Sequence, residues 1–395
     1  MNYVSNMTIY LDYQSTTPLH PDVSNKMSKF WSLEYGNPHS SEHFFGWKAS
    51  QAVDKARREV AEFLGAFEEE VIFTSGATEA NNIAILGHSE SLRESSRKVV
   101  LCGSTEHKCV YEASRKLANI TSSAFLAVPV DKYGHVNFEF LEKNLNSNTY
   151  ILSLMLVNNE IGAINDIKKA YEICQKHGVL LHCDASQATT VMDLSWLADC
   201  ADSISISGHK MYAPMGIGAL IISPYIASTL CPLVFGGGQE RGLRSGTLPV
   251  PLCVGLGAAC ELMSSEGFQT EISRVSKLRD EFYWALINSD LEIKLNGPEL
   301  EYRHKTNLNI SFTGINAKEM LDILQPGLCA SSGAACSSAV DGPSETLSAI
   351  GLSLSEANSS LRFSFGLSNT VDDVNAAIDA VSGAVTRLSV PGLTV

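Results

Sequence analysis

DSISISGHKMYAPMGIGALII, residues Asp202–Ile222, predicts two short apolar strands joined by a turn rich in Gly and Pro. The strands are expected at Ser203–Ser207 and Gly218–Ile222, and Lys210 stands three residues after the first of them. A buried ammonium is costly unless it is paired or neutralised, and a partly desolvated lysine is readily deprotonated. Lys210 is therefore a candidate for an amine that forms a Schiff base. From this stretch alone, a surface lysine in a loop is the more common alternative.

Apolar strands and helices alternate on the N-terminal side of this stretch, from about residue 48 to residue 222. Continuous apolar strands separated by helices predict a mainly parallel sheet that is covered on both faces. The expected strands are Val71–Thr74, Val99–Cys102, Ala124–Val128, Tyr150–Met155 and Val179–Cys183. The expected helices are Lys48–Leu64, Ala77–Gly87, Cys109–Ala118, Phe138–Asn144 and Ile167–His177.

The pattern changes on the C-terminal side, where residues 251–287 are long and helical. The elements expected after them are strands at Thr306–Phe312 and Ser360–Phe365 and helices at Ala317–Leu324 and Val371–Leu388. This shift predicts a large α/β domain at residues 13–258 and a small α+β domain from residues 1–12 and 259–395, in which Thr8–Asp12 packs. The stretch Ala330–Glu345 is rich in Ser, Gly and Ala and predicts an exposed, mobile loop that carries Cys336.

Composition limits the classes of partner. The 395 residues are 45% hydrophobic, enough for a large core and for about two or three domains. The net charge of −14 argues against direct binding to nucleic acid or to an anionic membrane. No apolar run reaches the ~18 residues of a membrane span, and no secretory signal is visible. Ten cysteines without a C-x-x-C pair predict reduced thiols and a cytoplasmic protein, with no metal site.

Polar side chains follow several strand ends, where open α/β sheets bind their ligands. Ser75-Gly76-Ala77-Thr78 leads from a strand into a helix, whose free N–H groups suit a phosphate. A helix capped by a Ser75 or Thr78 side chain is an equally common alternative. Asp184 follows another strand and needs a cationic partner if it is buried. His107 and Asn159 follow two more strands, although an isolated histidine is more often structural than catalytic.

One ligand accounts for this whole set. Pyridoxal phosphate requires a phosphate site, a lysine for its aldehyde, a carboxylate for its ring nitrogen, and groups for its ring face and phenolic oxygen. These are supplied in turn by Thr78, Lys210, Asp184, His107 and Gln187, and Ser207 and His209 can add bonds to the phosphate. The chain has neither the G-x-G-x-x-G fingerprint nor the P-loop that would favour a nucleotide site.

The motifs of the chain, taken in order, resemble those of the cysteine desulfurases, which belong to the aminotransferase class V group of fold-type I pyridoxal phosphate enzymes. These motifs are GNPHS, SGATEANN, TEHK, VNNEIG, HCDASQ, SGHKMYAPMGIGAL, GGGQERGLRSGT and SSGAACSS. The resemblance runs from about Ile9 to Leu388. It implies a seven-stranded-type sheet domain with a smaller domain, and a sulfurtransferase that converts L-cysteine to L-alanine and an enzyme persulfide.

The resemblance also implies roles for single residues. Lys210 would carry the cofactor, Asp184 would hold its pyridine nitrogen, and His107 would stack on its ring and relay substrate protons. Gln187 would meet the phenolic oxygen, and Asn159 and Arg362 would bind the substrate carboxylate. The phosphate would be held by Ala77, Thr78, Ser207 and His209, and by Thr247 of the other subunit, which implies a homodimer. Cys336 would take the sulfur and pass it to a sulfur-acceptor protein.

Alternatives to these assignments exist. Cys336 could be a buried small residue, Arg362 a cation on an outer face, and Cys329 a rival nucleophile, although the flank of Cys329 predicts burial. Ser332–Ser338 departs from the SGSAC-T-S of many relatives, and Ser389–Val395 is shorter than the tail by which some relatives dock a scaffold protein. The alternative functions are a selenocysteine lyase and a non-catalytic sulfur-relay or scaffold subunit. The sulfur could serve iron–sulfur clusters, tRNA or DNA modification.

Overall fold

A seven-stranded sheet forms the larger part of the protein, which we describe from a computed structural model of residues 8–332 and 344–389. Its strands, in spatial order, are β2 (Val71–Thr74), β8 (Gly218–Ile222), β7 (Ser203–Ser207), β6 (Leu180–Asp184), β5 (Thr149–Ser153), β3 (Val99–Gly103) and β4 (Ala124–Val128). Strand β8 pairs antiparallel with both of its neighbours, and the other pairs are parallel. The predicted mainly parallel sheet is confirmed.

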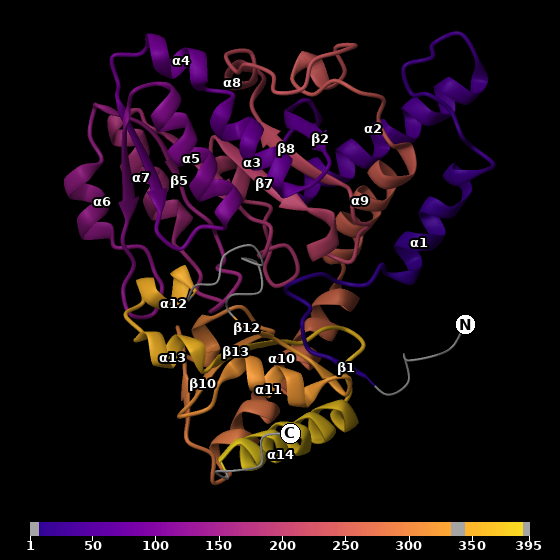
Figure 1. Cartoon of the computed structure of the whole chain (residues 1–395). Helices are drawn as coiled ribbons and strands as arrows, with labels where there is room; N and C mark the ends of the chain where they lie inside the picture. The colour runs from indigo at the N-terminus through magenta and orange to yellow at the C-terminus, as the bar shows by residue number, and fades with distance from the viewer. Residues whose placement is uncertain (1–7, 333–343, 390–395) are drawn as a thin grey trace.

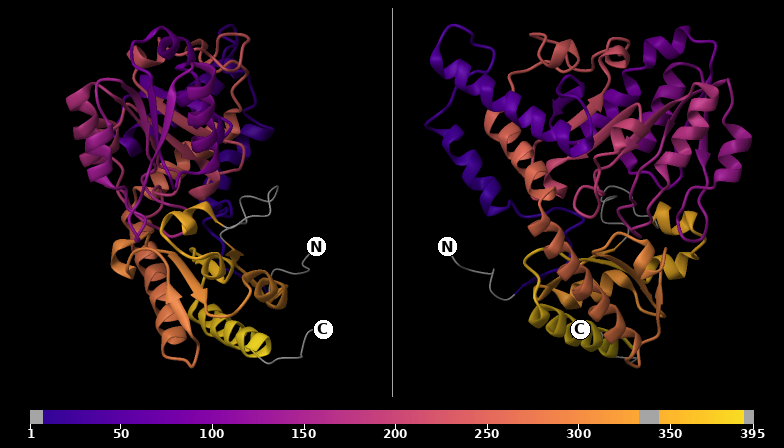
Figure 2. Two further views of the ribbon diagram at one scale, coloured as in Figure 1. Left: turned by 60° about the vertical axis from the view of Figure 1, so that its left-hand side comes forward. Right: turned by 180° about the vertical axis from the view of Figure 1, so that it is seen from behind.

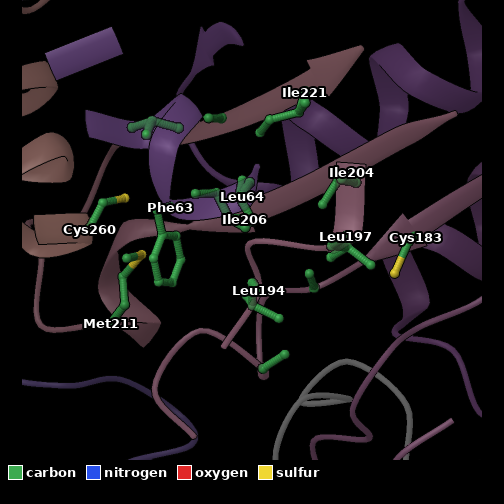
Figure 3. Close-up of a cluster of buried hydrophobic side chains, with 14 of the residues drawn as sticks. Phe63, Leu64, Cys183, Leu194, Leu197, Ile204, Ile206, Met211, Ile221 and Cys260 are labelled. Carbon is green, nitrogen blue, oxygen red and sulfur yellow. The ribbon is translucent and has the colours of Figure 1, made fainter. Parts of the chain in front are cut away.

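Successive residues of the strands pack against different helical layers. On β8, Leu220 belongs to the same apolar cluster as residues of α3 (Ala77–Leu86), whereas Ile221 faces the cluster that contains α2 (Phe44–Leu64) and α9 (Val250–Met263). Figure 3 shows this second cluster, in which Phe63 and Leu64 of α2 lie near Ile204, Ile206 and Ile221 of the sheet. Because side chains alternate across a strand, two apolar faces require a helical layer on each side of the sheet.

The remaining helices of this part are short or flank the sheet. They are α1 (Pro21–Ser28), α4 (Ser89–Glu94), α5 (Lys108–Ile120), α6 (Phe138–Asn144), α7 (Ile167–His177) and α8 (Pro224–Ala227). Helix α5 packs on α3, and α7 packs on β6. Figure 1 shows these elements in the upper part of the molecule, above the smaller part.

A four-stranded antiparallel sheet forms the smaller part, in the order β12 (Ser331–Ser332), β13 (Ser360–Ser364), β10 (Asn307–Phe312) and β9 (Ile293–Leu295). Its helices are α10 (Glu266–Ile287), α11 (Ala317–Leu324), α12 (Glu345–Ala349), α13 (Leu354–Asn358) and α14 (Val371–Ser389). The N-terminal strand β1 (Ile9–Tyr10) pairs in parallel with β11 (Leu328–Cys329) and with no strand of the large sheet among the described residues. Strand β1 and helix α14 lie together below the large sheet (Figure 1; Figure 2).

Several predicted boundaries differ from the structure, most of them by one or two residues. Helix α2 begins at Phe44 rather than Lys48, because the His43 side chain accepts a hydrogen bond from Gly46 N and caps the helix earlier. Strand β5 ends at Ser153 rather than Met155. The loop predicted at Ala330–Glu345 is too long at both ends, since β12 already pairs with β13 and α12 begins at Glu345.

Helix α9 continues through residue 258, where we placed the domain boundary, and Cys260 and Met263 still pack in the core of the large sheet. The division into residues 13–258 and the remainder therefore stays a prediction. Within the described part of the chain, we find no helix that is both long enough and apolar enough to cross a membrane.

Candidate active site

Ten of the twelve predicted site residues line one cavity of about 490 Å³ at the polar strand ends. They are Ala77, Thr78, His107, Asn159, Asp184, Gln187, Ser207, His209, Lys210 and Arg362. The carboxyl ends of β2, β3, β5, β6 and β7 meet at this edge because these strands run in the same direction. Residues separated by nearly 300 positions, from Ala77 to Arg362, are thereby brought together.

The turn between β2 and α3 has the features of a phosphate site. Gly76 occupies the N-cap position with φ +153°, and no side chain caps the helix. The alternative of a helix capped by Ser75 or Thr78 is therefore wrong, and the first N–H groups of α3 are not capped by a side chain. A Cβ atom at Gly218 of β8 would come within 2.7 Å of the Gly76 Cα atom, so Gly218 lets β8 approach this turn closely.

The Lys210 side chain lines the cavity, and Lys210 ends the short 3-10 turn Gly208–Lys210. Its Nζ atom donates to the main-chain oxygens of Gln14 and Ser15, each at 2.6 Å. These two carbonyl acceptors hold the amine in one place. The surface-loop alternative is wrong, because this lysine is half-buried in the cavity.

Asp184 ends strand β6 and is buried. Its Oδ2 atom accepts from Asn81 Nδ2 at 2.8 Å, and its Oδ1 atom accepts from Ser186 N at 2.9 Å. In the described part of the chain the carboxylate forms no ion pair, so the expected cationic partner is not supplied by a salt bridge. A carboxylate held in place by two amide hydrogen bonds is a suitable acceptor for a protonated ring nitrogen.

His107 follows β3 and caps helix α5, since its Nδ1 atom accepts from Cys109 N at 3.2 Å. Burial lowers the pKa of the ring, Asp184 raises it, and Lys210 and Lys108 lower it, with a net decrease. The neutral imidazole is thus favoured near pH 7. A neutral ring in the cavity suits stacking on an aromatic cofactor and exchange of protons through the second ring nitrogen.

Arg362 lies on β13 and is buried, so the alternative of a cation on an outer face is wrong. One terminal nitrogen donates to Asp12 Oδ1 at 2.6 Å and to Ser15 Oγ at 2.8 Å, and the other donates to Asn159 O at 2.8 Å. Its Nε atom has no partner among the described residues. A buried guanidinium with an unused donor at a cavity is suited to a carboxylate ligand.

His209 and Gln187 also have defined surroundings. His209 Nδ1 lies 3.2 Å from Thr16 Oγ1, and burial and Lys210 lower the pKa of the ring to about 4. Gln187 Nε2 donates to Gln14 O at 3.1 Å. The loop that follows β1 therefore holds both side chains at the cavity. Both are neutral groups that can form hydrogen bonds with a ligand.

Two predicted residues are not among the described residues that line the cavity. Thr247 is exposed and lies outside the cavity lining, and Cys336 lies outside the described residues. Cys329, the rival thiol, ends strand β11. We predicted that it is buried, and the structure shows it only partly buried. Burial and the Asp12 carboxylate raise the pKa of Cys329, which leaves it a neutral thiol near pH 7.

Sequence reasoning missed the loop after β1. Gln14 and Ser15 line the cavity, and Asp12 pairs with Arg362. The motif search also passed over Cys109, although it stands two residues after His107 and lines the cavity. For Asp12 the only available signal was the rule that a buried arginine needs a partner, and that rule does not say which of the acidic residues supplies it.

The described residues fit pyridoxal phosphate. The cavity volume lies in the range of about 300–1,000 Å³ that is usual for ligand sites. An uncapped helix start, a lysine amine and a hydrogen-bonded carboxylate lie along it, as the phosphate, aldehyde and ring nitrogen require. Buried Ser186 Oγ lines the cavity and lacks a partner among the described residues, which is consistent with a polar ligand.

Comparison with known proteins identifies relatives along almost the whole chain. The profile of the Aminotransferase class-V family matches residues 9–377. The cysteine desulfurase IscS of Rickettsia rickettsii (strain Iowa) is 40% identical over 387 residues, which cover 98% of this chain and 93% of the relative. A solved NifS-like protein superposes with a TM-score of 0.88 at 31% identity, covering 96% of this chain and 100% of that one. The solved structure of SspA in complex with cysteine has a TM-score of 0.79 at 33% identity, covering 91% and 99%.

Proposed function

The chain belongs to the aminotransferase class-V family and is a pyridoxal phosphate-dependent cysteine desulfurase, and from this premise we propose how its residues divide the reaction. The bound cofactor supplies an electron sink for the α-carbon of the substrate. Lys210 is the amine that holds the cofactor aldehyde, and Asp184 holds its ring nitrogen. The observation that carries this proposal is that Lys210, Asp184 and the uncapped start of α3 line one cavity.

The other cavity residues orient the two ligands. Ala77, Thr78, Ser207 and His209 bind the cofactor phosphate together with the first N–H groups of α3. His107 stacks on the ring and moves substrate protons, and Gln187 binds the phenolic oxygen. The carboxylate of L-cysteine lies against Asn159 and Arg362. The unpartnered Nε atom of Arg362 supports this last assignment, since a bound carboxylate would satisfy it.

Sulfur transfer is assigned to Cys336. Its thiolate attacks the sulfur of the bound substrate, the new S–S bond forms, and the Cβ–S bond breaks with its electron pair left on carbon. Protonation of that carbon gives L-alanine, and the enzyme retains a persulfide. Cys109 and Cys329 are poorer nucleophiles, because burial raises the pKa of both thiols. An acceptor protein then takes the outer sulfur, and iron–sulfur cluster assembly is the destination that we propose.

The active unit is a homodimer in which Thr247 binds the cofactor phosphate held by the partner subunit. Thr247 is exposed, and Arg244, in the same loop, forms an ion pair with Glu79 of α3 at 2.9 Å. Val234 forms a β-bridge with Arg244. The side chain of the next residue, Phe235, is 82% exposed. A large exposed aromatic side chain beside this loop supports a surface that another chain covers.

The nine cysteines of the described residues are free thiols, which supports a cytoplasmic site of action.

Chemical trapping of the cofactor tests this assignment. The purified enzyme is reduced with borohydride, digested, and searched by mass spectrometry for the lysine that carries the cofactor mass. We expect the modification on Lys210 alone, and we expect the Lys210→Ala variant to lose turnover completely. The matched control is Lys108→Ala, which removes a lysine next to His107 that does not line the cavity. Modification of any other lysine in the native enzyme would refute the assignment.

A further inference from the structure

A chain of buried polar side chains lies beside the cofactor cavity and joins two of its proposed working groups. Asn81, on the inner side of α3, is completely buried. Its amide contacts Asp184 on one side and His182 on the other, and the Cys109 sulfur lies next to the same amide nitrogen. None of the proposed roles above involves Asn81 or Cys109, so the function of this chain of contacts needs its own explanation.

The orientation of the Asn81 amide is fixed by Asp184. A carboxylate can only accept, so the Asn81 nitrogen must face it, as the 2.8 Å contact from Nδ2 to Asp184 Oδ2 requires. The Asn81 oxygen then faces His182 Nε2 at 2.8 Å and must accept from it. Burial lowers the pKa of His182 to about 4, so this ring is neutral and carries its proton on Nε2. His182 Nδ1 lies 2.9 Å from Ser203 Oγ, which donates to it.

The second hydrogen of the Asn81 amide orients the thiol. Asn81 Nδ2 lies 3.3 Å from Cys109 Sγ and donates to it. Burial raises the pKa of Cys109 to about 12, so the sulfur keeps its own hydrogen. The acceptor for that hydrogen is His107 Nδ1, 3.0 Å from the sulfur, while the Thr78 side chain also forms a hydrogen bond with this thiol and lowers its pKa. The thiol thus lies between an amide that donates to it and an imidazole to which it donates.

The backbone determines which ring nitrogen of His107 accepts. Cys109 N can only donate, and it lies 3.2 Å from His107 Nδ1, so this atom carries no proton in the neutral ring. The thiol adds a second donor to the same atom. Both contacts favour the neutral ring with its proton on Nε2, and both oppose protonation of Nδ1. Nε2 is then the ring nitrogen that remains for a ligand in the cavity.

We propose that Cys109 is a positioning residue for His107, whose thiol, oriented by Asn81, holds the imidazole neutral with its proton on Nε2. The Asn81 amide donates to both Asp184 and Cys109. These hydrogen bonds therefore link the Asp184 carboxylate to the protonation state of His107. This inference rests on the proposed roles of His107 and Asp184. The charged and titratable groups that act on His107 and Cys109 from the neighbouring elements are Asp184, Lys210, Lys108 and Glu106, and none of them replaces the donor that Cys109 supplies.

A vibrational measurement tests the thiol contact without any turnover. Raman spectra of the holoenzyme and of Cys109→Ser are subtracted, which isolates the S–H stretching band of Cys109. We expect a band lowered in frequency, as for a donating thiol, and we expect it to rise in His107→Phe, where the acceptor is missing. An absent S–H band, or a band that does not move in His107→Phe, would overturn the proposal.

A titration tests the effect on His107. Loss of the thiol donor should raise the His107 pKa by roughly 0.5–1 unit in Cys109→Ala, because a hydrogen bond to the neutral ring is worth ~1 kcal/mol. NMR of labelled histidine in the holoenzyme measures that pKa, and the acid limb of the kcat profile should move with it. Cys109→Ser keeps a hydroxyl donor and should restore the native value. Cys102→Ala, which removes a buried thiol outside the cavity lining, is the matched control.

The outcomes separate this inference from the proposed function. If Cys109→Ala leaves the His107 pKa unchanged while Lys210 still carries the cofactor, the positioning role is wrong and the proposed function stands. If the His107 pKa moves as expected but the cofactor is found on another lysine, the contact is real and the proposed site is wrong. A change in thermal stability of Cys109→Ala with no change in the pKa would show a purely structural role, and would also refute the proposal.

Discussion

At the scale of single residues, the partners of the charged groups decide what each group can do. Lys210 could be recognised in the sequence because it follows a buried strand, but its contacts with the carbonyl groups of Gln14 and Ser15 could not. Arg362 is similar, since its partner Asp12 is 350 positions away. Local patterns predict which side chains lie at strand ends, whereas contacts across the chain depend on how the two sheets are placed.

The guanidinium of Arg362 leads to a prediction about substrate binding. In Arg362→Lys the charge remains, but the planar set of donors is lost, so we expect KM for L-cysteine to rise at least about tenfold with a smaller change in kcat. Steady-state kinetics with the cofactor in excess measure this. Asp12→Asn is the control, because it keeps Arg362 and removes only the ion pair. A KM that is unchanged in Arg362→Lys would show that the residue has a purely structural role.

At the scale of elements, the periodic parts of the fold were predictable and the irregular parts were not. Strands β2, β4, β7 and β8 and helices α6, α7 and α11 have the predicted bounds, because alternating and helical hydrophobic periods give strong signals. The early start of α2 and the short strand β12 depend on a side-chain cap and on pairing with β13. Neither has a periodic signal in the sequence.

The turn at Gly76 allows a test of the proposed phosphate site. Gly76→Ala should weaken cofactor binding by about tenfold or more, since φ +153° strains a residue with a Cβ atom at the start of α3. Equilibrium dialysis measures the dissociation constant of the cofactor. Gly314→Ala is the control, because it also changes a glycine of positive φ, +76°, but in the smaller part, where a Cβ atom would meet nothing within 4 Å. Equal cofactor affinity in the two variants would contradict the assignment.

At the scale of the whole molecule, the cavity takes residues from both sheets and from the N-terminal loop. Arg362 comes from the small sheet, Asp184 from the large one, and Ser15 from the segment between β1 and α1. The order of strands β2 to β7 in the chain predicts the sheet and its polar edge. The placement of the small sheet against that edge has no local signal, and only the site role of Arg362 was implied by the family resemblance.

A mixing experiment tests the proposed dimer. Lys210→Ala chains and Thr247→Ala chains are unfolded, combined in equal amounts and refolded with cofactor. If each site uses Lys210 of one chain and Thr247 of the other, half of the dimers carry one intact site, so activity should reach roughly a quarter of the native value. Each variant refolded alone provides the baseline. Activity no higher than the average of the two, or a fully active monomer in sedimentation, would contradict the composite site.

The fate of the sulfur tests the central claim most directly. Native enzyme is given one equivalent of isotopically labelled L-cysteine, quenched, alkylated and mapped by mass spectrometry. We predict one labelled sulfur on Cys336, one equivalent of alanine, and none on Cys109 or Cys329. In Cys336→Ser we predict normal cofactor binding and at most about a thousandth of the native alanine production, since that variant lacks the attacking thiolate. Labelled sulfur on Cys329 or Cys109, or near-native alanine production by Cys336→Ser, would contradict the account.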